Sequence, residues 1–231
     1  MNSRSVYSPL MRVDLHVHTY PASSCSSIAY RDLIAHCRTQ RLAAIALTNH
    51  GDLSDNRRLE GALAEVGTVL VHGVEISTPS GDFIVYSCDL EYLAGFGAVQ
   101  GVPQPGTIPG DAAVVWVHPA AGGGRSGSIY HPALGAEVAP VIDAIEVWNG
   151  NWTQARFVDT AMRLCDTLGK PATAGSDAHR VERLGVCTTE IEGEVRSTAD
   201  VVAAIKAGAV SPVAPQGAGR GRGHLFDFFR R

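Results

Sequence analysis

The chain reads MRVDLHVH over residues 11–18, a short apolar strand pattern that ends in two histidines. The same arrangement recurs along the sequence, because one apolar run after another is followed by residues that can do chemistry. The runs are Met11–Val17, Ala43–Leu47, Thr68–Val74, Asp82–Ser87, Ala112–Val117, Ile142–Trp148 and Ala172–Ala174. Most of them are continuously apolar, which is typical of strands covered on both faces. The pattern therefore predicts a buried sheet.

Helical spacing of apolar residues separates many of these runs. Helices are predicted at Ala29–Arg41, Asn56–Val66, Thr153–Leu168 and Ser197–Ala207, with Gly169 and Gly208 as stop signals. The Gly- and Pro-rich segments Gln100–Gly110 and Ala121–Ser128 are predicted to be loops. Alternation of strands and helices favours an α/β fold with a parallel sheet, either open or closed.

Length and composition limit the class of protein. The 231 residues include 19 Lys and Arg against 23 Asp and Glu, a net charge of −4, and 45% are hydrophobic. This composition excludes global disorder, and the acidic balance disfavours a nucleic-acid partner without excluding one. No stretch approaches the ~20 apolar residues of a membrane span, so no membrane contact is expected. We expect one barrel domain over residues 1–211, because α/β barrels often run to roughly 200–250 residues, and a Gly/Arg-rich tail over residues 212–231.

The cysteines and the first residues indicate a cellular compartment. Five cysteines are scattered without C-x-x-C spacing, which predicts reduced thiols. Residues Met1–Leu10 lack the apolar core of a secretory signal. We therefore expect a cytoplasmic protein.

Three polar residues of the first strand suggest a metal site. Asp14, His16 and His18 lie at positions i, i+2 and i+4, so their side chains are expected on one face. Burying three polar groups on one face is costly unless something satisfies them. A divalent metal does this, since imidazoles ligate and a carboxylate either ligates or orients an imidazole.

Other strand ends carry the same residue types. His50, Glu75, His118 and the pair Asp177 and His179 each follow a different apolar run. If the sheet closes, all of them lie at the C-terminal rim, where barrel enzymes place their chemistry. A set rich in histidine suits Zn, Mn or Fe and fits Mg or Ca poorly. The candidates are too many for one tetrahedral ion, so two or more ions are expected, with Glu75 as the candidate bridge.

Five motifs resemble those of the polymerase and histidinol phosphatase (PHP) family. They are DLHVHT (Asp14–Thr19), LTNH (Leu47–His50), GVEIS (Gly73–Ser77), VHP (Val117–Pro119) and GSDAH (Gly175–His179), in the family's order. The resemblance implies a distorted TIM-like (β/α)7 barrel with two or three metal ions that hydrolyses phosphoesters.

The resemblance also implies a division of ligands among the ions. His16, His18, Glu75 and Asp177 resemble the ligands of one ion. His118 resembles a ligand of a second ion that shares Glu75, and His50 and His179 resemble ligands of a third.

The chain departs from the family pattern in three places. Asn49 stands where the family motif has Asp, which removes a charge beside His50. Ser23 and Ser24, beside Cys25, stand where many members have Asp or His, so the third site is either incomplete or recruits Cys25. Asp82 follows Gly81 where members often have a His, and it either ligates through oxygen or leaves the second ion with fewer ligands.

The predicted reaction is metal-dependent phosphoester hydrolysis by an activated water. A small phosphomonoester or a nucleotide-type phosphodiester is the expected substrate. Asp177 and His179 are the candidate catalytic residues, and Arg125 and Arg180 are candidates for holding the phosphate.

Two other functions remain open from the sequence. The first is an amidohydrolase-like enzyme that acts on a non-phosphate substrate. No lysine follows a predicted strand, which removes the carbamylated-lysine form of that chemistry. The second is a metal-binding or regulatory module without turnover, which Asn49, Ser23 and Ser24 favour. The substrate and the oligomeric state are not specified by the sequence.

Overall fold

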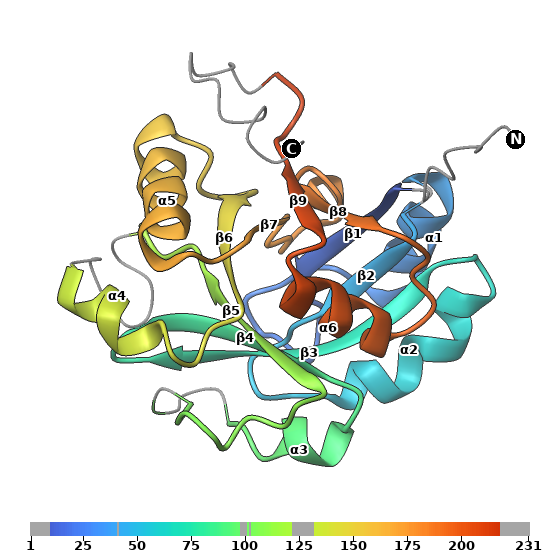
Figure 1. Ribbon diagram of the computed structural model, residues 1–231. Helices are drawn as coiled ribbons and strands as arrows, with labels where there is room; N and C mark the ends of the chain where they lie inside the picture. Colours follow the sequence, from blue (N-terminus) through green and yellow to red (C-terminus); the bar gives the residue numbers. More distant parts are fainter. Residues whose placement is uncertain (1–9, 41, 98–100, 102, 122–131, 218–231) are drawn as a thin grey trace, which may run out of the picture.

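The computed structural model describes residues 10–40, 42–97, 101, 103–121 and 132–217. The described strands form one sheet in the order β7-β6-β5-β4-β3-β2-β1-β8-β9 (Figure 1). The strands are β1 Leu10–Val17, β2 Ala44–Leu47, β3 Val69–Thr78, β4 Gly81–Ser87, β5 Ala112–Val117, β6 Ala144–Asn149, β7 Ala172–Gly175, β8 Thr188–Glu192 and β9 Val210–Val213. The helices are α1 Tyr30–Gln40, α2 Ser54–Ala64, α3 Leu90–Ala94, α4 Pro132–Val138, α5 Ala155–Leu168 and α6 Thr198–Ala207, with the 3₁₀ helix η1 Val181–Arg183.

Two reversed strands, β4 and β8, make the sheet mixed rather than parallel. Strand β4 runs antiparallel to both β3 and β5, and β8 runs antiparallel to both β1 and β9, whereas β1, β2 and β3 pair in parallel, as do β5, β6 and β7. The connection from Thr78 to Gly81 is too short for a parallel crossover, which needs a dozen or more residues. Because β4 is the lone reversed strand between β3 and β5, those two strands still end at the same rim.

The barrel closes between β1 and β7 without a strand ladder. A single parallel bridge joins Val17 to Ala178, and the N–H of His18 donates to the carbonyl of Ala178 at 3.1 Å. Side-chain hydrogen bonds from β1 and from β8 make further connections to β7 and to the residue that follows it. Asp14 Oδ1 accepts from the N–H of Ser176 at 2.9 Å, and Thr189 Oγ1 bonds both the N–H and the carbonyl of Ala174. This incomplete closure confirms the predicted distorted barrel.

Buried apolar side chains fill the inside of the barrel. Tyr86 on β4 spans this interior, and its hydroxyl donates to the carbonyl of Leu15 on β1 at 2.6 Å. Helix α6 packs Val201, Val202 and Ile205 into the same cluster. Its Lys206 donates to the carbonyl of Ala112, where β5 begins, so α6 covers the end opposite the carboxyl ends of the strands.

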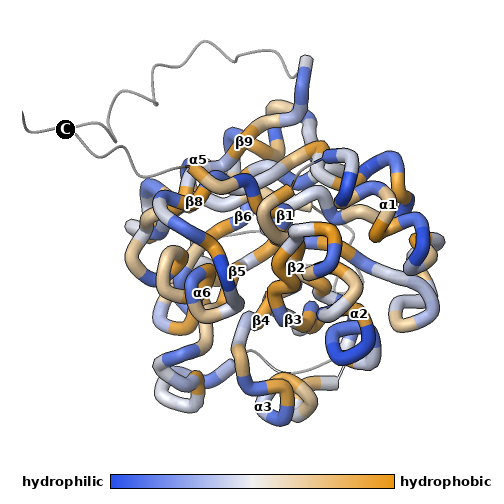
Figure 2. Tube along the Cα trace, turned by 90° about the vertical axis from the view of Figure 1, so that its right-hand side faces the viewer, coloured by the Kyte–Doolittle hydropathy of each residue, from blue (hydrophilic) through white to orange (hydrophobic). Residues whose placement is uncertain are grey.

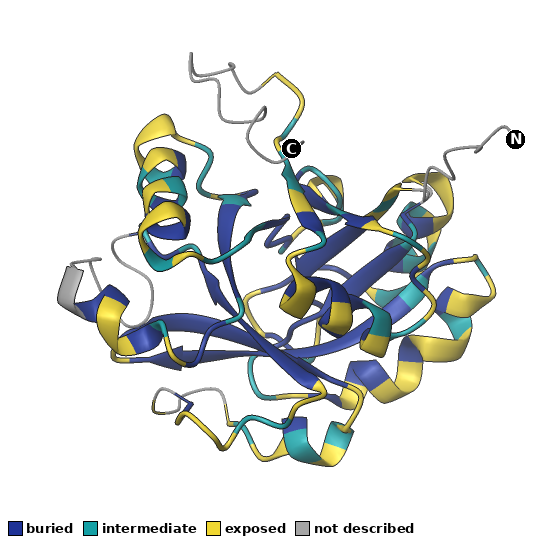
Figure 3. Ribbon diagram, viewed as in Figure 1, coloured by how far each residue is buried: buried dark blue, intermediate teal, exposed yellow. Residues whose placement is uncertain are grey.

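The other helices cover the outside of the wall. Helices α1 and α2 pack against β1 and β2, and α5 packs against β5 and β6. The strands are buried along most of their length, while each helix keeps an exposed face (Figure 3). The hydropathy trace shows the same division, with apolar residues along the central strands and polar residues along α2 (Figure 2). None of the described helices is long and apolar enough to cross a bilayer.

The predicted helices agree with the structure to within a few residues. Gly169 and Gly208 end α5 and α6 in left-handed conformations, with φ of 63° and 68°. The sequence did not predict α3, α4, β8 or β9. Strand β9 continues to Val213, past the predicted start of the tail at residue 212, and residues 218–231 lie outside the described part of the chain.

Candidate metal centre

The carboxyl ends of the strands bring the predicted ligands to one end of the barrel. His16 lies near the end of β1 and His18 directly follows it, His50 follows β2, Glu75 lies within β3, and His118 follows β5. Asp177 and His179 follow β7. All seven predicted ligands belong to groups of side chains whose ligand atoms lie within 4.8 Å of one another. Glu75 differs from the prediction in that β3 continues beyond it to Thr78.

Five of these residues form what we term the inner group, which consists of His16, His18, Glu75, His118 and Asp177. Glu75 lies at its centre. Its Oε2 is 3.1 Å from His18 Nε2 and 3.5 Å from His16 Nε2, and its Oε1 is 3.2 Å from His118 Nε2. Asp177 Oδ1 is 3.5 Å and 3.4 Å from the same two nitrogens of His16 and His18. The inner group therefore directs nitrogen and oxygen donors at shared points.

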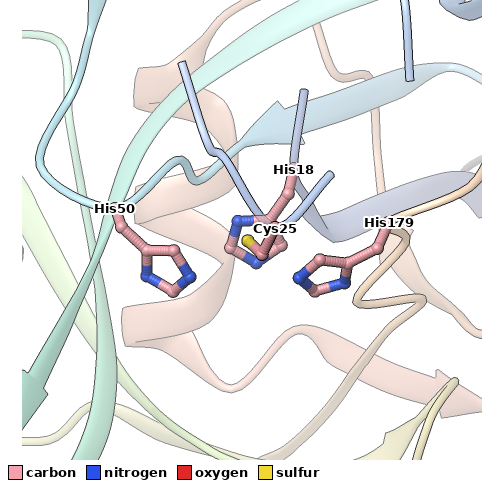
Figure 4. Close-up of side chains that lie close together, drawn as sticks. All are labelled: His18, Cys25, His50 and His179. Carbon is pink, nitrogen blue, oxygen red and sulfur yellow. The ribbon is translucent and has the colours of Figure 1, made fainter. Parts of the chain in front are cut away.

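Three further side chains form the outer group, which consists of Cys25, His50 and His179 (Figure 4). The ring of His18 is stacked between those of His50 and His179, with centroid distances of 4.7 and 4.5 Å. His50 also reaches the inner group, because its Nδ1 is 3.3 Å from Glu75 Oε2. The two groups are thus contiguous.

Glu146 on β6 is a member of the site that sequence reasoning missed. It is buried, and its Oε1 is 3.0 Å from His16 Nδ1. Its Oε2 accepts from the N–H of His118 at 3.1 Å and from Asn149 Nδ2 at 2.8 Å. A proton on His16 Nδ1 therefore points at Glu146 and leaves Nε2 as a lone pair that faces the inner group. The sequence feature that could have identified Glu146 is the presence of a carboxylate inside the apolar run Ile142–Trp148.

Asn149 links Glu146 to the carboxylate after β7. Its Nδ2 donates to Glu146 Oε2 and lies 3.3 Å from Asp177 Oδ2. Asn149 thus orients two carboxylates of the site, whereas Trp148 packs against the apolar cluster that includes β5 and β6.

Burial and charge together shift the pKa values in the inner group. Burial opposes the charged form of His18, but hydrogen bonds to Asp177 and Glu75 outweigh it and raise the pKa of His18 to about 9. Burial likewise opposes the charge of His118, and Glu75 raises its pKa to about 9. Burial raises the pKa of Glu75 and Asp177, but the charged His16 and its neighbours hold both pKa values below their usual range. The histidines of the inner group therefore stabilise the charged carboxylates, and the carboxylates stabilise the charged histidines.

Two of the predicted ligands have unusual backbone conformations. His118 and Asp177 have φ of 32° and 49°, on the side of φ/ψ space that non-glycine residues rarely adopt. Such residues typically cost roughly 1–3 kcal/mol each and cluster at functional sites. Position 175 requires a glycine for steric reasons, because a Cβ there would lie 2.4 Å from His16 Cβ and 2.8 Å from Glu146 Oε1.

Asp14 does not share the role of His16 and His18, contrary to the expectation from their spacing. The pairing of β1 with β2 is irregular between Asp14 and Val17, which interrupts the regular alternation of faces. The Asp14 carboxylate instead accepts from the backbone N–H groups of Ser176 and Gly185, at 2.9 and 2.8 Å. It joins β1 to the segment after β7.

Asn49 takes part in a buried hydrogen-bond network that includes the carboxylate of Asp55. Its Oδ1 accepts from the N–H of Thr19 at 2.8 Å, and its Nδ2 donates to Thr19 Oγ1 at 2.9 Å. The Thr19 hydroxyl donates to Asp55 Oδ2 at 2.6 Å, and Tyr30 donates to the other oxygen of Asp55. A negative charge is therefore present close to this motif, on α2 rather than at position 49.

The other departures from the family pattern also lie at the site. Asp82 begins β4 and forms a group with Glu75 and His118, in which its Oδ2 is 3.9 Å from His118 Nδ1. Ser23 Oγ is 3.4 Å from His18 Nδ1 and accepts from the N–H of His50. Ser24 is exposed.

The structure places one of the two predicted phosphate-binding arginines. Arg180 is exposed and directly follows His179, at the start of η1. Arg125 lies outside the described residues. Both remain predictions.

Comparison with known proteins gives matches in sequence and in fold. A family model described as PHP-associated matches residues 156–210. PsfC from Pseudomonas syringae is 19% identical, with a TM-score of 0.68 over 91% of this chain and 94% of that one. A two-domain protein from Bacteroides vulgatus, which contains a predicted PHP-like metal-dependent phosphoesterase, is 16% identical, with a TM-score of 0.69 over 91% of this chain and 66% of that one.

An amidohydrolase from Chromobacterium violaceum with bound sulfate and no metal is also 16% identical, with a TM-score of 0.56 over 89% of this chain and 99% of that one. No curated protein matches the sequence significantly. The predicted resemblance to the PHP family is confirmed by the family model and the shared fold.

Proposed function

We propose that this chain, with its PHP fold, is a metal-dependent phosphoesterase. Its substrate would be a small phosphomonoester or a nucleotide-type phosphodiester, and it would use two or three divalent ions of Zn, Mn or Fe. The observation that carries the proposal is the convergence of imidazoles and carboxylates from β1, β2, β3, β5 and β7 and the residues that directly follow these strands, in overlapping groups whose ligand atoms lie within 4.8 Å of one another.

The donor set fits divalent transition ions. His16 Nε2 and His18 Nε2 are 3.1 Å apart, and both face the carboxylates of Glu75 and Asp177. Imidazole suits Zn, Mn and Fe, whereas Ca and Mg prefer oxygen ligands throughout. His16, His18, Glu75 and Asp177 would hold one ion, His118 and Glu75 a second with Asp82 beside it, and His50 and His179 a third. Such ions lower the pKa of water and neutralise charge that develops on phosphoryl oxygens.

The chain's own residues would orient these ligands. Glu146 holds the Nδ1 proton of His16 and keeps Nε2 directed at the inner group. The Nδ1 of His179 is 2.9 Å from the carbonyl of Asp177, so a proton there leaves the other ring nitrogen free to ligate. Glu75 offers Oε1 to one side and Oε2 to the other, as a bridging carboxylate would.

A group is also needed to bind the phosphate. Arg180 is exposed next to His179, and a guanidinium matches phosphate oxygens in geometry and charge. We propose Arg180 and Arg125 for this role, with Asp177 and His179 as the catalytic residues beside them.

The positions of the lysines argue against one form of the amidohydrolase alternative. The chain contains two lysines, Lys170 and Lys206. Lys170 donates to the carbonyl of Ile142 and Lys206 to that of Ala112, where they lie near the starts of β6 and β5. Both are at the end of the barrel opposite the candidate metal centre, so a carbamylated lysine cannot bridge ions there.

The test is metal-dependent turnover by the purified protein. It is stripped with a chelator, reloaded separately with Mn, Zn or Fe, and assayed on a chromogenic phosphomonoester, a phosphodiester and an amide. We expect metal-dependent phosphoester hydrolysis that falls by at least about 10³-fold in His118→Ala and Asp177→Ala. His72→Gln is the matched control, because His72 is a buried histidine on β3 that contacts Asn56 outside the two groups. Undiminished turnover without metal contradicts the proposal, and turnover of the amide alone favours the alternative.

A further inference from the structure

We propose that Cys25 supplies a thiolate to an ion held together with His50 and His179, which makes the outer group a zinc-selective site. The inference deepens the proposed function and rests on its metal centre. It gives the outer group a ligand set different from that of the inner group, which has oxygen and nitrogen donors only.

The first support is the arrangement of the side chains. One ligand atom from each of Cys25, His50 and His179 lies within 4.8 Å of the others, together with His18 (Figure 4). Bond lengths of about 2.3 Å to sulfur and 2.0–2.1 Å to nitrogen place two ligands of a tetrahedral zinc about 3.6 Å apart. The side chains therefore need to approach by only about 1 Å.

The fourth member of this group is committed elsewhere. His18 Nε2 is 3.1 Å from Glu75 Oε2 and 3.1 Å from His16 Nε2, within the inner group. Its Nδ1 faces Ser23 Oγ at 3.4 Å. An ion in the outer group then has three protein ligands and one open position, which is the arrangement of catalytic zinc sites.

The second support is the way the loop that carries Cys25 is held. Its serines bond to the backbone of each histidine around it. Ser23 Oγ accepts from the N–H of His50 at 3.2 Å, and Ser26 Oγ donates to the carbonyl of His18 at 2.8 Å. The N–H of Ser27 donates to the carbonyl of His179 at 2.9 Å. These bonds hold the thiol beside the two imidazoles.

The ligand chemistry then sets the choice of ion. Thiolate favours zinc and other soft or borderline ions, whereas manganese favours carboxylate and water. On binding, the Cys25 thiol releases its proton to the solvent and its sulfur forms the bond to the ion, with no change in oxidation state. Two imidazoles and one thiolate therefore favour zinc over manganese in the outer group.

Cobalt(II) reports on the sulfur ligand independently of catalysis. The stripped full-length protein is titrated with cobalt(II), and its absorption is compared among Cys25→Ser, Cys25→Asp and Cys88→Ser. We expect a thiolate-to-cobalt charge-transfer band in the near ultraviolet for the unmodified chain and for Cys88→Ser, and none for either variant of Cys25. Cys88 is the matched control, because it is also exposed and belongs to no group of candidate ligands among the described residues.

Alkylation and zinc binding give a second measurement. Iodoacetamide should label both Cys25 and Cys88 in the stripped protein, and zinc should slow the labelling of Cys25 by at least about tenfold while the labelling rate of Cys88 stays unchanged. Cys25→Ser should weaken the binding of the last zinc ion by at least about tenfold, and Cys25→Asp should restore binding while reducing the preference for zinc over manganese.

Two results would overturn the inference in different ways. If cobalt binds without a charge-transfer band and zinc leaves the labelling rate of Cys25 unchanged, the thiolate ligand is wrong while the metal-dependent function stands. If the chain binds no divalent ion at all, the inference and the proposed function fail together.

Discussion

The inner and outer groups share histidines of similar chemistry but differ in how they are supported. His16 on β1 and His18 directly after it are fully buried, and a contact with Glu146 on β6 holds the orientation of the His16 ring. In the outer group, the side chain of His179 is 30% exposed, and Cys25 lies exposed on a loop. Preorganised donors on strands favour tight binding in one geometry, whereas donors on loops admit solvent and exchange. The comparison predicts that an ion bound by the inner group would exchange more slowly than one bound by the outer group.

Removing the carboxylate at the centre of the inner group should have the largest effect. Glu75→Ala leaves His16, His18 and His118 without their shared partner, so we expect loss of at least one bound ion and a fall in turnover of about 10³-fold or more. Elemental analysis and kcat/KM report the two effects. Glu91→Ala, which removes an exposed carboxylate paired with Arg57, is the control. Retention of every ion in Glu75→Ala would contradict the central place of Glu75.

The pH dependence of metal binding should report on the histidines of the inner group. The pKa values of His18 and His118 are raised to about 9 in the metal-free fold, above a usual value of 6.5. Their charged forms thus stabilise the metal-free fold fully below pH 6.5, and this stabilisation is lost as pH rises through about 9.

Binding at the inner group must displace these two protons, so its apparent affinity should rise by up to about 100-fold from pH 7 to pH 8. Calorimetry in buffers of different ionisation enthalpy counts the protons released. Release of fewer than one proton on inner-group binding would show that these histidines are already neutral.

The support behind the ligands can be tested through Glu146. In Glu146→Gln, an amide oxygen that faces His16 leaves the amide NH₂ opposite the N–H of His118 and the Nδ2 of Asn149, all of them donors. We expect metal affinity at the inner group or turnover to fall by about 10–100-fold, with cobalt binding at the outer group little changed. Glu91→Gln is the control. Equal losses in the two groups would remove the distinction between them.

The smallest expected effect concerns Asn49. In Asn49→Asp, the new carboxylate cannot donate to Thr19 Oγ1, whose single proton already goes to Asp55. We expect a loss of about 1–3 kcal/mol in the free energy of unfolding with metal content unchanged. Urea unfolding measures this loss, and adding Asp55→Asn should recover part of it, since Thr19 can then donate to position 49. Strictly additive losses would argue against the shared network.

Much of this architecture was predictable from the sequence, because continuous apolar runs indicate buried strands and helical spacing of apolar residues indicates amphipathic helices. An apolar run does not specify the direction of its strand. The reversed direction of β4 can be inferred only from the short turn after Thr78. Strand β9 contains Pro212 and lies at the edge of the sheet, where apolar patterning is weak.

The site was predicted less completely, for reasons that are local. The spacing placed Asp14 on the same face as His16 and His18, but the irregular pairing of β1 breaks the regular alternation of faces. Glu146 acts through His16, which lies 130 residues away in sequence, and no short motif links the two. The position of Cys25 depends on serine side chains that bond to distant backbone groups, which no periodicity predicts.

The barrel wall is only partly paired along the seam between β1 and β7, so ions bound at this seam would also hold the wall together. His18 stands on one side of this seam and Asp177 on the other, while the backbones there are joined by one bridge. An ion shared by these residues would cross-link two edges of the barrel wall. Release of the ion would then favour local opening at this edge before any other part of the wall separates, because ligands that bind only the closed form stabilise it.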